Sequence, residues 1–345
     1  MSGAVSDGAI TGQIWRDGKP IDGFDLAVIS DCLTEDHTLV WADLEDPSEE
    51  TMGRLAEELD LSPWAVEDAL AASERTKATT YAHHTFVTVY AVRCSDDAGV
   101  RAADTPTGVS QSIATQRVSV FIKRNALITV RLTESADIVD MDEVRRRWDE
   151  TEAHDRGVEA LLHGLLDVVV DGHFEAVQTL DDAIEDLEGL LFDESVAART
   201  LQRRTYGVRK DLVALRRVVL PMREVVAVIQ HRRDALGAGD RLDPEFADLY
   251  DHVLRAAEWT ESLRDMVSTV FETNLSLQDA RLNTVMKKLT GWAAIIAVPT
   301  AITGFYGQNV PFPGFDHTVG FVTSCVLLLT AMVVLYALFK RRDWL

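Results

Sequence analysis

The sequence predicts an α+β membrane protein, built from an N-terminal αβα domain, a long stalk helix and two C-terminal transmembrane helices. Three observations predict this fold class. Short β-rich runs alternate with helical segments in the first 135 residues. A helical pattern without Gly or Pro then extends over residues 245–290. Two stretches near the C-terminus, 289–315 and 320–339, contain no charged side chain.

The chain combines an acidic body with an apolar, slightly basic C-terminal part. Of its 345 residues, 34 are Lys or Arg and 56 are Asp or Glu, so the formal net charge is −22. From residue 285 onward the net charge is +3, which leaves −25 for the first 284 residues. Such acidity argues against nucleic-acid binding, because neutralising phosphates needs a basic face. The three cysteines are too widely spaced for a disulfide framework or a zinc knuckle.

The N-terminal domain is expected to span residues 1–135 and to end in a β-hairpin. Alternating and β-branched runs predict four strands, at residues 38–44, 85–92, 117–122 and 127–132. Residues 123–126, which join the last two strands, have the pattern of a hairpin turn. The stretch 95–112 is rich in Gly, Asp, Thr and Ser and predicts a flexible loop.

Two helices are expected between the first two strands, at residues 49–59 and 63–72. Ser48 and Ser62 stand at the N-cap positions, where a serine hydroxyl accepts a hydrogen bond from an unpaired N–H of the first turn. Pro63 occupies the first helical position, where its fixed φ suits a helix and its missing N–H is not needed.

The second part of the chain is predicted to be helical. Helices are expected at residues 137–151, 158–191 and 195–236, within a cytosolic helical region that spans 136–242. Asp243 then caps, and Pro244 begins, a stalk helix assigned to residues 243–288. This segment is either a coiled coil that docks a partner or a stalk that joins a cytosolic sensor to the membrane. We favour the stalk, because the same helix continues into the first span.

The C-terminal part is predicted to be a membrane hairpin. A helix of about 20 residues covers roughly 30 Å, the thickness of the hydrocarbon core. The hairpin consists of a first span at 289–307, an outer loop at 308–318, a second span at 319–340 and a basic tail at 341–345. Two buried helices of a soluble protein are the disfavoured alternative, because only about a dozen residues separate the two uncharged stretches.

The charges that flank the spans predict their orientation. Lys287 and Lys288 precede the first span, Lys340, Arg341 and Arg342 follow the second, and the outer loop has neither Lys nor Arg. Under the positive-inside rule both termini then face the cytoplasm. The first residues form no hydrophobic signal-peptide core. We therefore expect a multi-pass protein of the cell membrane with a cytosolic N-terminal domain.

One face of the first span is small or weakly polar. Its members recur at spacings of three and four residues and so share one side of a helix: Asn283, Met286, Leu289, Ala293, Ala297, Thr300 and Gly304. Such a face can line a pore when several copies surround an axis, and it also suits plain helix packing. The periodicity leaves both interpretations open. The larger side chains, Trp292, Ile295, Ile296, Val298 and Phe305, point elsewhere and suit lipid or neighbouring helices.

No catalytic motif is visible in the chain. There is no Walker A sequence, no Rossmann glycine fingerprint and no HExxH, so we expect a protein that is not an enzyme. His163 and His173 lie ten residues apart on one predicted helix. A zinc site at these two histidines is disfavoured relative to two solvated side chains on the helix surface.

Several short sequences together resemble a known family. Tyr306-Gly307-Gln308-Asn309 ends the first span, and Lys340-Arg341-Arg342-Asp343-Trp344-Leu345 ends the chain. The match extends through residues 283–287 beside the membrane, 248–252 on the stalk and 66–70 in the N-terminal domain. In these segments the chain resembles the CorA family of divalent metal ion (magnesium/cobalt) transporters. The family signature is Tyr-Gly-Met-Asn, so Gln308 makes this chain a GQN variant of the GMN signature.

The resemblance implies a homopentameric funnel in the lipid bilayer, whose copies surround one pore. It implies that the protein moves the divalent cations Mg²⁺ and Co²⁺ into the cytoplasm, down the membrane potential. It further implies that Mg²⁺ is a regulator as well as a cargo, because Mg²⁺ bound between cytosolic domains favours closure. Asp68 and Asp248 match the family positions that hold this regulatory ion.

The resemblance also implies roles along the pore. The outer selectivity ring falls at the end of the first span, at Tyr306, Gly307, Gln308 and Asn309. Asn309 would form the ring itself, and Gly307 would permit the tight loop. Deeper in the pore, the implied lining residues are Asn283, Met286, Leu289 and Thr300. Met286 and Leu289 would form a hydrophobic gate.

Two other functions stay open. Proteins with an altered signature resemble ZntB-type zinc transporters, some of which are thought to use a proton gradient. Gln308 has an amide where the family signature has a thioether, which could change the ion preference. A membrane-anchored scaffold, whose acidic domain binds a partner, would need no pore at all. Ion flux into liposomes separates the three possibilities.

Overall fold

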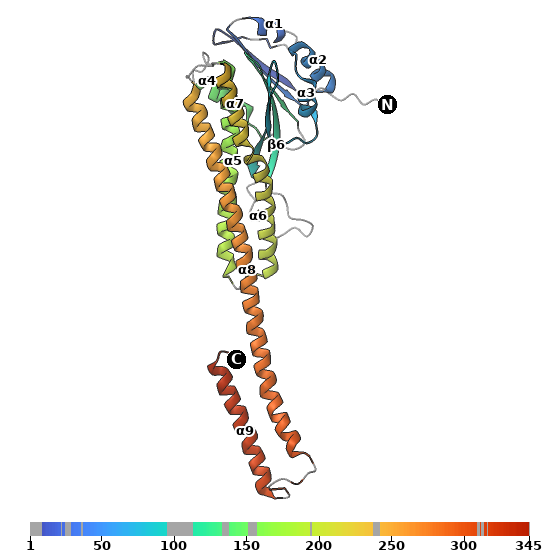
Figure 1. Ribbon diagram of the computed structural model, residues 1–345, viewed down its shortest axis with the longest axis vertical. Helices are drawn as coiled ribbons and strands as arrows, with labels where there is room; N and C mark the ends of the chain where they lie inside the picture. The colour runs from blue at the N-terminus through green and yellow to red at the C-terminus, as the bar shows by residue number, and fades with distance from the viewer. Residues whose placement is uncertain are drawn as a thin grey trace, which may run out of the picture. The chain divides into compact units, whose positions relative to one another are not determined.

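The computed structural model in Figure 1 describes most of the chain, namely residues 9–21, 23–24, 29–35, 37–94, 113–132, 138–150, 157–193, 195–236, 242–308, 311, 314–315 and 317–344. The chain divides into two compact units, Met1–Val270 and Phe271–Leu345. Two sequence predictions, the flexible loop at 95–112 and the ring residue Asn309, lie outside the described residues.

A sheet forms the centre of the first unit and has seven strands within the described residues. In spatial order these are β2 (Lys19–Ile21), β1 (Ile10–Arg16), β3 (Thr38–Glu45), β7 (Ala126–Arg131), β6 (Ile113–Ile122), β5 (Thr85–Cys94) and β4 (Lys77–Thr80). Neighbouring strands are antiparallel except β3 and β7, which pair in parallel. The four predicted strands are confirmed as β3, β5, β6 and β7. The sequence pattern does not predict β1, β2 and β4.

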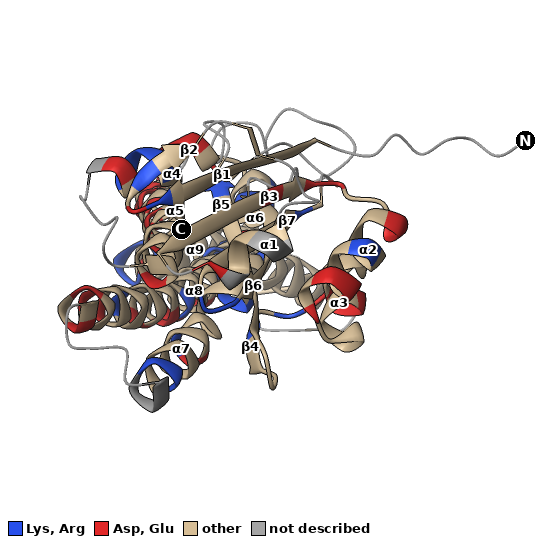
Figure 2. Ribbon diagram, turned by 90° about the horizontal axis from the view of Figure 1, so that it is seen from above, with Lys and Arg blue, Asp and Glu red and all other residues tan. Residues whose placement is uncertain are grey.

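Helices cover both faces of this sheet (Figure 2). One face carries α1 (Ile29–Thr34), α2 (Glu49–Leu59) and α3 (Pro63–Leu70), where Leu55 packs with Phe121 of the sheet. The other face carries α5 (Gly157–Leu191), α7 (Met222–Leu236) and the start of α8 (Asp243–Tyr306), where Phe246 packs in one core with Val118. The predicted αβα domain is therefore confirmed, and its second helical layer comes from residues that follow residue 135.

The local sequence signals explain several element boundaries. Ser48 accepts a hydrogen bond on its hydroxyl from the main-chain N–H three residues later, at 3.1 Å, and so caps α2 as predicted. Pro63 begins α3, but Ser62 makes no side-chain capping bond although its backbone is extended. The predicted hairpin turn between β6 and β7 closes with a hydrogen bond from Lys123 N to Ala126 O at 2.9 Å.

The prediction of one continuous helix over residues 195–236 is wrong, because two helices occupy this segment. They are α6 (Ala198–Val219) and α7 (Met222–Leu236), and the break falls at Leu220 and Pro221. Proline has no N–H to donate to the carbonyl four residues back, and its ring clashes with that carbonyl. The helices predicted at 137–151 and 158–191 are confirmed as α4 (Met141–Glu150) and α5.

Helix α8 is continuous over 64 residues, as the unbroken pattern predicts. Its first part belongs to the first unit and buries Phe246, Leu249 and Val253. Its last part belongs to the second unit, and the helix continues through Pro299. Helix α9 (Thr318–Arg341) follows. By length and composition, α8 and α9 each contain a stretch that can cross a membrane.

A buried ion pair joins the two parallel strands of the sheet. Arg131 on β7 donates from Nη2 and Nε to the carboxylate oxygens of Asp43 on β3, at 2.8 and 3.3 Å. Thr129 Oγ1 donates to the same carboxylate at 2.5 Å and accepts from Trp41 Nε1 at 3.3 Å. Both charged side chains are buried, so each depends on the other for compensation of its lost hydration.

Replacing Asp43 by alanine should lower the free energy of unfolding by about 3–5 kcal/mol, because the charge of Arg131 then stays buried without its closest partner. A urea titration followed by tryptophan fluorescence measures the loss. The control is Glu35→Ala, which removes an exposed ion pair with Arg16 and should cost less than about 1 kcal/mol. Equal losses in the two variants would contradict the importance of the buried pair.

Candidate functional site

In the second unit, α9 covers one face of the apolar part of α8. The covered positions of α8 recur every three or four residues: Gly291 and Ile295 are buried, and Ala294, Val298, Pro299 and Ile302 are half-buried. The half-buried positions of α9 have the same spacing: Ser324, Cys325, Leu328, Ala331, Met332, Leu335 and Phe339. The described residues of this unit contain no third helix, and α9 lies alongside the end of α8 (Figure 1), so we infer that these two faces are turned toward each other.

The small, weakly polar face predicted for the first span lies on the opposite side of α8. All seven of its members are exposed: Asn283, Met286, Leu289, Ala293, Ala297, Thr300 and Gly304. At about 100° per residue, they centre roughly half a turn away from Ile295. The structure thus brings the seven side chains together on one uncovered stripe, which we call the free face. A single chain does not decide between pore lining and packing.

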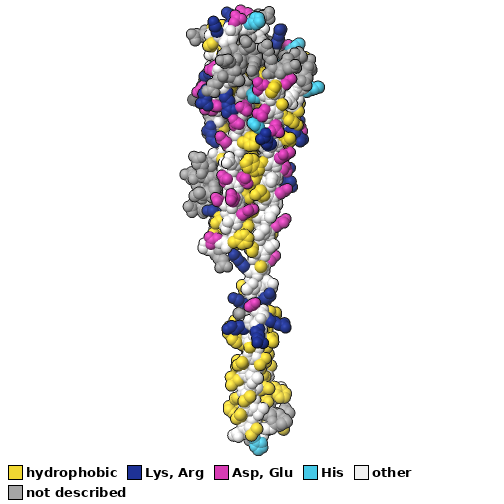
Figure 3. Space-filling view, turned by 90° about the vertical axis from the view of Figure 1, so that its left-hand side faces the viewer, with side chains coloured by type: hydrophobic (Ala, Val, Ile, Leu, Met, Phe, Trp, Pro, Cys, Tyr) yellow, Lys and Arg dark blue, Asp and Glu magenta, His cyan; other side chains and the backbone are white. Residues whose placement is uncertain are grey.

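Large apolar side chains flank the free face. Trp292 and Ile296 lie along one side of it and Phe305 along the other, with exposed fractions of 52%, 66% and 59%. Figure 3 shows hydrophobic side chains over the surface of the second unit, and Lys and Arg gathered at one end of it. An apolar surface that ends in basic side chains is typical of a segment that lies in lipid and stops at the headgroups.

The free face offers polar atoms without charge. Thr300 Oγ1 donates to the carbonyl of Ile296 at 2.8 Å, so its proton is used within the helix and its oxygen stays available as an acceptor. Asn283 adds an amide, and the other members are small or apolar. Such a surface can contact water or a hydrated cation but provides no carboxylate to hold an ion tightly.

Helix α8 ends in a tight turn at the signature sequence. Gly307 N donates to Thr303 O at 2.8 Å, and Gln308 N donates to Phe305 O at 3.2 Å. A Cβ atom on Gly307 would lie 3.1 Å from the Thr303 carbonyl oxygen, so a side chain here would press on the last helical turn. Tyr306 is half-buried and Gln308 is exposed.

A second glycine contact, which the sequence analysis does not predict, lies at the start of α9. Gly314 has φ of +95°, and a Cβ on Gly320 would lie 2.3 Å from the carbonyl oxygen of Gly314. The main chain at residue 314 therefore approaches residue 320 so closely that only glycine fits at position 320. Two glycines six residues apart, bracketing a helix start, are the signal that could have revealed this contact.

In the first unit, Asp68 already binds a cation of its own chain. It lies in the last turn of α3, and Lys77 Nζ at the start of β4 lies 2.6 Å from Asp68 Oδ2 and 3.3 Å from Glu74 Oε1. Desolvation by burial disfavours the charged lysine, but the hydrogen bonds to Asp68 and Glu74 raise the pKa of Lys77 above its ordinary value. The Asp68 side chain is 25% exposed, so it is partly open to solvent while it holds this lysine.

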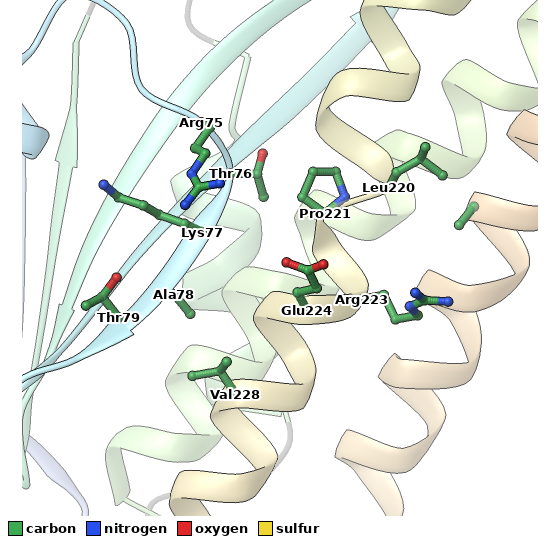
Figure 4. A pocket seen from close by; sticks show the side chains of 11 residues that line it. Arg75, Thr76, Lys77, Ala78, Thr79, Leu220, Pro221, Arg223, Glu224 and Val228 are labelled. Carbon is green, nitrogen blue, oxygen red and sulfur yellow. The ribbon is translucent and has the colours of Figure 1, made fainter.

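Lys77 also borders a cavity of about 560 Å³ between β4 and the first turn of α7 (Figure 4). Thr76 and Ala78 lie on the α7 side of the strand, whereas the Lys77 side chain extends away from α7. This alternation is the ordinary period of two of a β-strand. It directs Lys77 to the face of the sheet that α3 covers.

Asp248 differs from Asp68 in being open to solvent. Its side chain is 69% exposed, and His252 Nε2 lies 3.8 Å from Asp248 Oδ2 one turn along α8. Among the described residues no group of three or more His, Cys, Asp or Glu is arranged to hold a metal ion. A metal site made from Asp68 and Asp248 therefore stays a prediction.

The two histidines considered for zinc each contact a main-chain carbonyl oxygen instead. His163 Nε2 lies 3.1 Å from Glu245 O, and His173 Nε2 lies 2.7 Å from Tyr90 O. His173 is 1% exposed, and desolvation lowers the pKa of His173 to about 4. The interpretation of His173 as a solvated helix residue is therefore wrong, because it faces the sheet.

Comparison with known proteins decides the family. The sequence model of the family described as CorA-like Mg²⁺ transporter protein matches residues 36–341, which is most of this chain. The chain belongs to the CorA family. Members of this family are transporters, in line with a chain predicted not to be an enzyme.

Individual relatives agree with the family assignment. The cobalt/magnesium transport protein CorA of Thermotoga maritima is 26% identical over 293 residues, which cover 85% of this chain and 79% of that protein. The complete structure of the CorA magnesium transporter from Methanocaldococcus jannaschii superposes with a TM-score of 0.72 at 22% identity and covers 97% of this chain and 98% of that one. The latter likeness shows that the CorA fold extends over the whole chain.

A relative of different ion preference is almost as similar. The zinc transport protein ZntB of Yersinia enterocolitica is 25% identical over 298 residues, which cover 83% of this chain and 82% of that protein. Identity alone thus does not separate a magnesium from a zinc transporter. Members of the CorA family are membrane proteins, and α8 and α9 are the two helices of this chain whose length and composition suit transmembrane spans, among the described residues.

A cysteine scan tests whether the free face meets other copies. With Cys32, Cys94 and Cys325 replaced by alanine, a cysteine introduced at Ala297 should form disulfide-linked dimers under mild oxidation, because this position lies on the free face. A cysteine at Ile295 should not, because α9 covers it. Non-reducing gel electrophoresis of the membranes measures the dimer. Crosslinking at position 295 alone would show that copies meet on the face of α8 that contains Ile295, which would contradict the prediction.

Proposed function

We propose that several copies of this chain form a transporter that moves Mg²⁺, and also Co²⁺, into the cytoplasm down the membrane potential. One observation carries the proposal: α9 leaves uncovered an uncharged stripe of α8, and this stripe runs toward the signature Tyr306-Gly307-Gln308-Asn309. The family resemblance implies five copies, with the homopentamer embedded in the lipid bilayer.

Several copies are needed because two helices cannot enclose an aqueous path. A ring of chains that turn their free faces inward surrounds one axis with Asn283, Thr300 and the small residues between them. Met286 and Leu289, which are 58% and 62% exposed in one chain, then meet near the cytoplasmic end and form a hydrophobic gate. The flanking residues Trp292, Ile296 and Phe305 contact lipid or the neighbouring chain.

The chemistry of the free face suits a hydrated divalent ion. Mg²⁺ gives up its water reluctantly, so neutral amide and hydroxyl oxygens can hold it through its hydration shell. Carboxylates in the pore would bind it too tightly for rapid exit. The membrane potential contributes about 4.6 kcal/mol per divalent ion at 100 mV, since each elementary charge gains about 2.3 kcal/mol. Transport therefore needs no nucleotide hydrolysis.

The direction of transport follows from the proposed topology. The basic residues at both membrane flanks, Lys287, Lys288 and the 340–342 cluster, place both termini in the cytoplasm by the positive-inside rule. The signature then faces outward, and the acidic first unit faces the cytoplasm. An inside-negative potential drives cations from the signature toward the gate.

We also propose that Mg²⁺ bound between neighbouring first units closes the pore. Asp68 and Asp248 supply the oxygen ligands that Mg²⁺ prefers, and one or two carboxylates with several retained waters are its usual protein site. Two carboxylates from two chains fit that requirement. The bound ion would hold adjacent copies together when cytoplasmic Mg²⁺ is plentiful.

A zinc transporter is the second candidate, favoured by the altered signature and compatible with the similarity to ZntB. Gln308 replaces the methionine of the family signature, and a ZntB relative is 25% identical to this chain. Purified protein in liposomes separates the candidates. Mg²⁺ or Co²⁺ uptake driven by voltage alone supports the first, zinc uptake that requires a pH gradient supports the second, and no flux in intact oligomers supports a scaffold.

Asn309→Ala should abolish selective Mg²⁺ uptake, because it removes the amide that the outer ring would present to the ion. Uptake into liposomes under an applied potential measures the loss, and size-exclusion chromatography checks assembly. The matched control is Gln308→Met, which restores the family signature and should keep uptake. Unchanged transport by the alanine variant would remove Asn309 from the ring.

Asp248→Ala should weaken the protection that Mg²⁺ gives the cytosolic part against proteolysis, because one of the two proposed ligands is lost. Limited digestion at increasing Mg²⁺ measures the half-protecting concentration. The control is Asp251→Ala, three residues further along α8, whose exposed carboxylate pairs with Arg255 of its own helix. If the Asp248 variant and the parent are protected at the same concentration, Asp248 is not a ligand.

A further inference from the structure

We propose that the ammonium group of Lys77 competes with the divalent cation for Asp68, and so sets the ion concentration at which the cytosolic site fills. This inference rests on the proposed function, because it takes Asp68 as a ligand of the regulatory site. It goes further in giving a regulatory role to a residue that binds no ion. The competitor is built into the same chain as the ligand.

The backbone holds the lysine in place. Lys77 begins β4 and pairs with Thr88 of β5 in the antiparallel ladder. The loop before it is fixed as well, because the hydroxyl of Tyr90 donates to the main-chain carbonyl of Glu74. Lys77 therefore reaches Asp68 from a fixed strand, with most of its side chain covered: 20% of it is exposed.

The carboxylate is held from the other side. Asp68 lies in the last turn of α3, and Arg117 Nη2 of β6 donates to the neighbouring carbonyl of Ala69 at 3.0 Å. The end of α3 is thus tied to the sheet directly beneath it. Because the strand and the helix end are both fixed, the 2.6 Å contact between Lys77 and Asp68 is made before any ion arrives.

An incoming divalent ion meets a like charge at this carboxylate. A cation that binds either oxygen of Asp68 lies within a few ångströms of Nζ, where charge repulsion is strong. The ion must therefore displace Lys77 from Asp68. Glu74, whose Oε1 lies 3.3 Å from Nζ, remains as a partner for the displaced lysine.

The charges around the proposed site also balance in this arrangement. Asp68, Glu74 and Lys77 together carry a formal charge of −1, and Asp248 of a neighbouring copy adds −1. One divalent cation neutralises the sum. Without Lys77 the same site carries −3, and the ion would bind more tightly than a reversible sensor needs. Asp248 has the more distant His252 Nε2 beside it, at 3.8 Å, so in this proposal the closer contact at Asp68 has the larger effect on the affinity.

The test measures Mg²⁺ protection of the full-length protein in detergent against chymotrypsin, a protease whose sites do not change when Lys or Arg is replaced by Gln. Lys77→Gln should lower the half-protecting Mg²⁺ concentration by about tenfold, because it removes a positive charge that repels the cation next to its carboxylate ligand. Glu74→Gln should raise it, because Lys77 then has Asp68 as its only carboxylate partner. The two variants move in opposite directions, which general destabilisation cannot produce.

Two controls separate this contact from bulk charge. Arg75→Gln removes a positive charge two residues away, on an exposed side chain, and should shift the concentration by less than about twofold because solvent screens it. Lys77→Arg keeps the charge and should stay near the parent. Thermal unfolding in EDTA checks that each variant is folded without the ion.

The outcomes distinguish this inference from the proposed function. If Mg²⁺ does not protect the parent, the regulatory site itself is refuted. If the parent is protected and Lys77→Gln behaves like it, or Arg75→Gln shifts the concentration equally, the competition is refuted. If Lys77→Gln is unfolded in EDTA, Glu74→Gln decides: a lowered or unchanged half-protecting concentration overturns the proposal.

Discussion

The packing of α9 on one side of α8 is the interaction on which the functional argument depends. In a bilayer, helices gain no hydrophobic energy by leaving lipid, so close packing and polar contacts determine which faces meet. Ile295 and its neighbours are covered on one side of α8 within the single chain. The stripe that remains is small and uncharged, and in the proposed ring of identical chains it faces the central axis. The proposed pore and gate both rest on this division of one helix into two faces.

The first unit presents the two carboxylates of the proposed regulatory site in very different states. Asp248 projects from α8 into solvent, with a histidine one turn away at 3.8 Å. Asp68 is partly covered and held by Lys77 at 2.6 Å. An ion that bridges two copies therefore finds one ligand ready and must compete for the other. A sensor that responds to cytoplasmic Mg²⁺ needs moderate affinity, and an internal competitor is one way for a chain to reduce it.

The sequence predicts those elements whose signals are local. The cap of α2 is predictable because the Ser48 hydroxyl and the N–H that it accepts from lie only three residues apart. The turn at Lys123 is predictable because it involves only four consecutive residues. The two spans are clear because uncharged stretches of about 20 residues have few other uses. The strands β2 and β4 are short, polar and at the sheet edges, so hydrophobic alternation is missing from them. The break at Pro221 is hidden because apolar residues keep a helical period across it.

Contacts between distant residues are harder to predict than elements. No pattern connects Asp68 with Lys77, because a loop of unknown path separates α3 from β4 until the strand pairing is known. The burial of His173 against Tyr90 O is similarly invisible, since the sequence shows a histidine on a helix but not which face meets the sheet. By contrast, the free face of α8 is predictable in membership, because periodicity along one helix defines it. Which side α9 would cover required the structure.

The composition of the free face bears on which ion passes it. Protein zinc sites are built from cysteine, histidine and carboxylate side chains, and soft ligands favour zinc, whereas carbonyl and water oxygens suit Mg²⁺. The free face contains no histidine or cysteine, and Cys325 lies on the side of α9 that packs against α8. A free face without soft ligands is what the proposed passage of a hydrated magnesium ion requires, whereas a path for zinc would be expected to offer them.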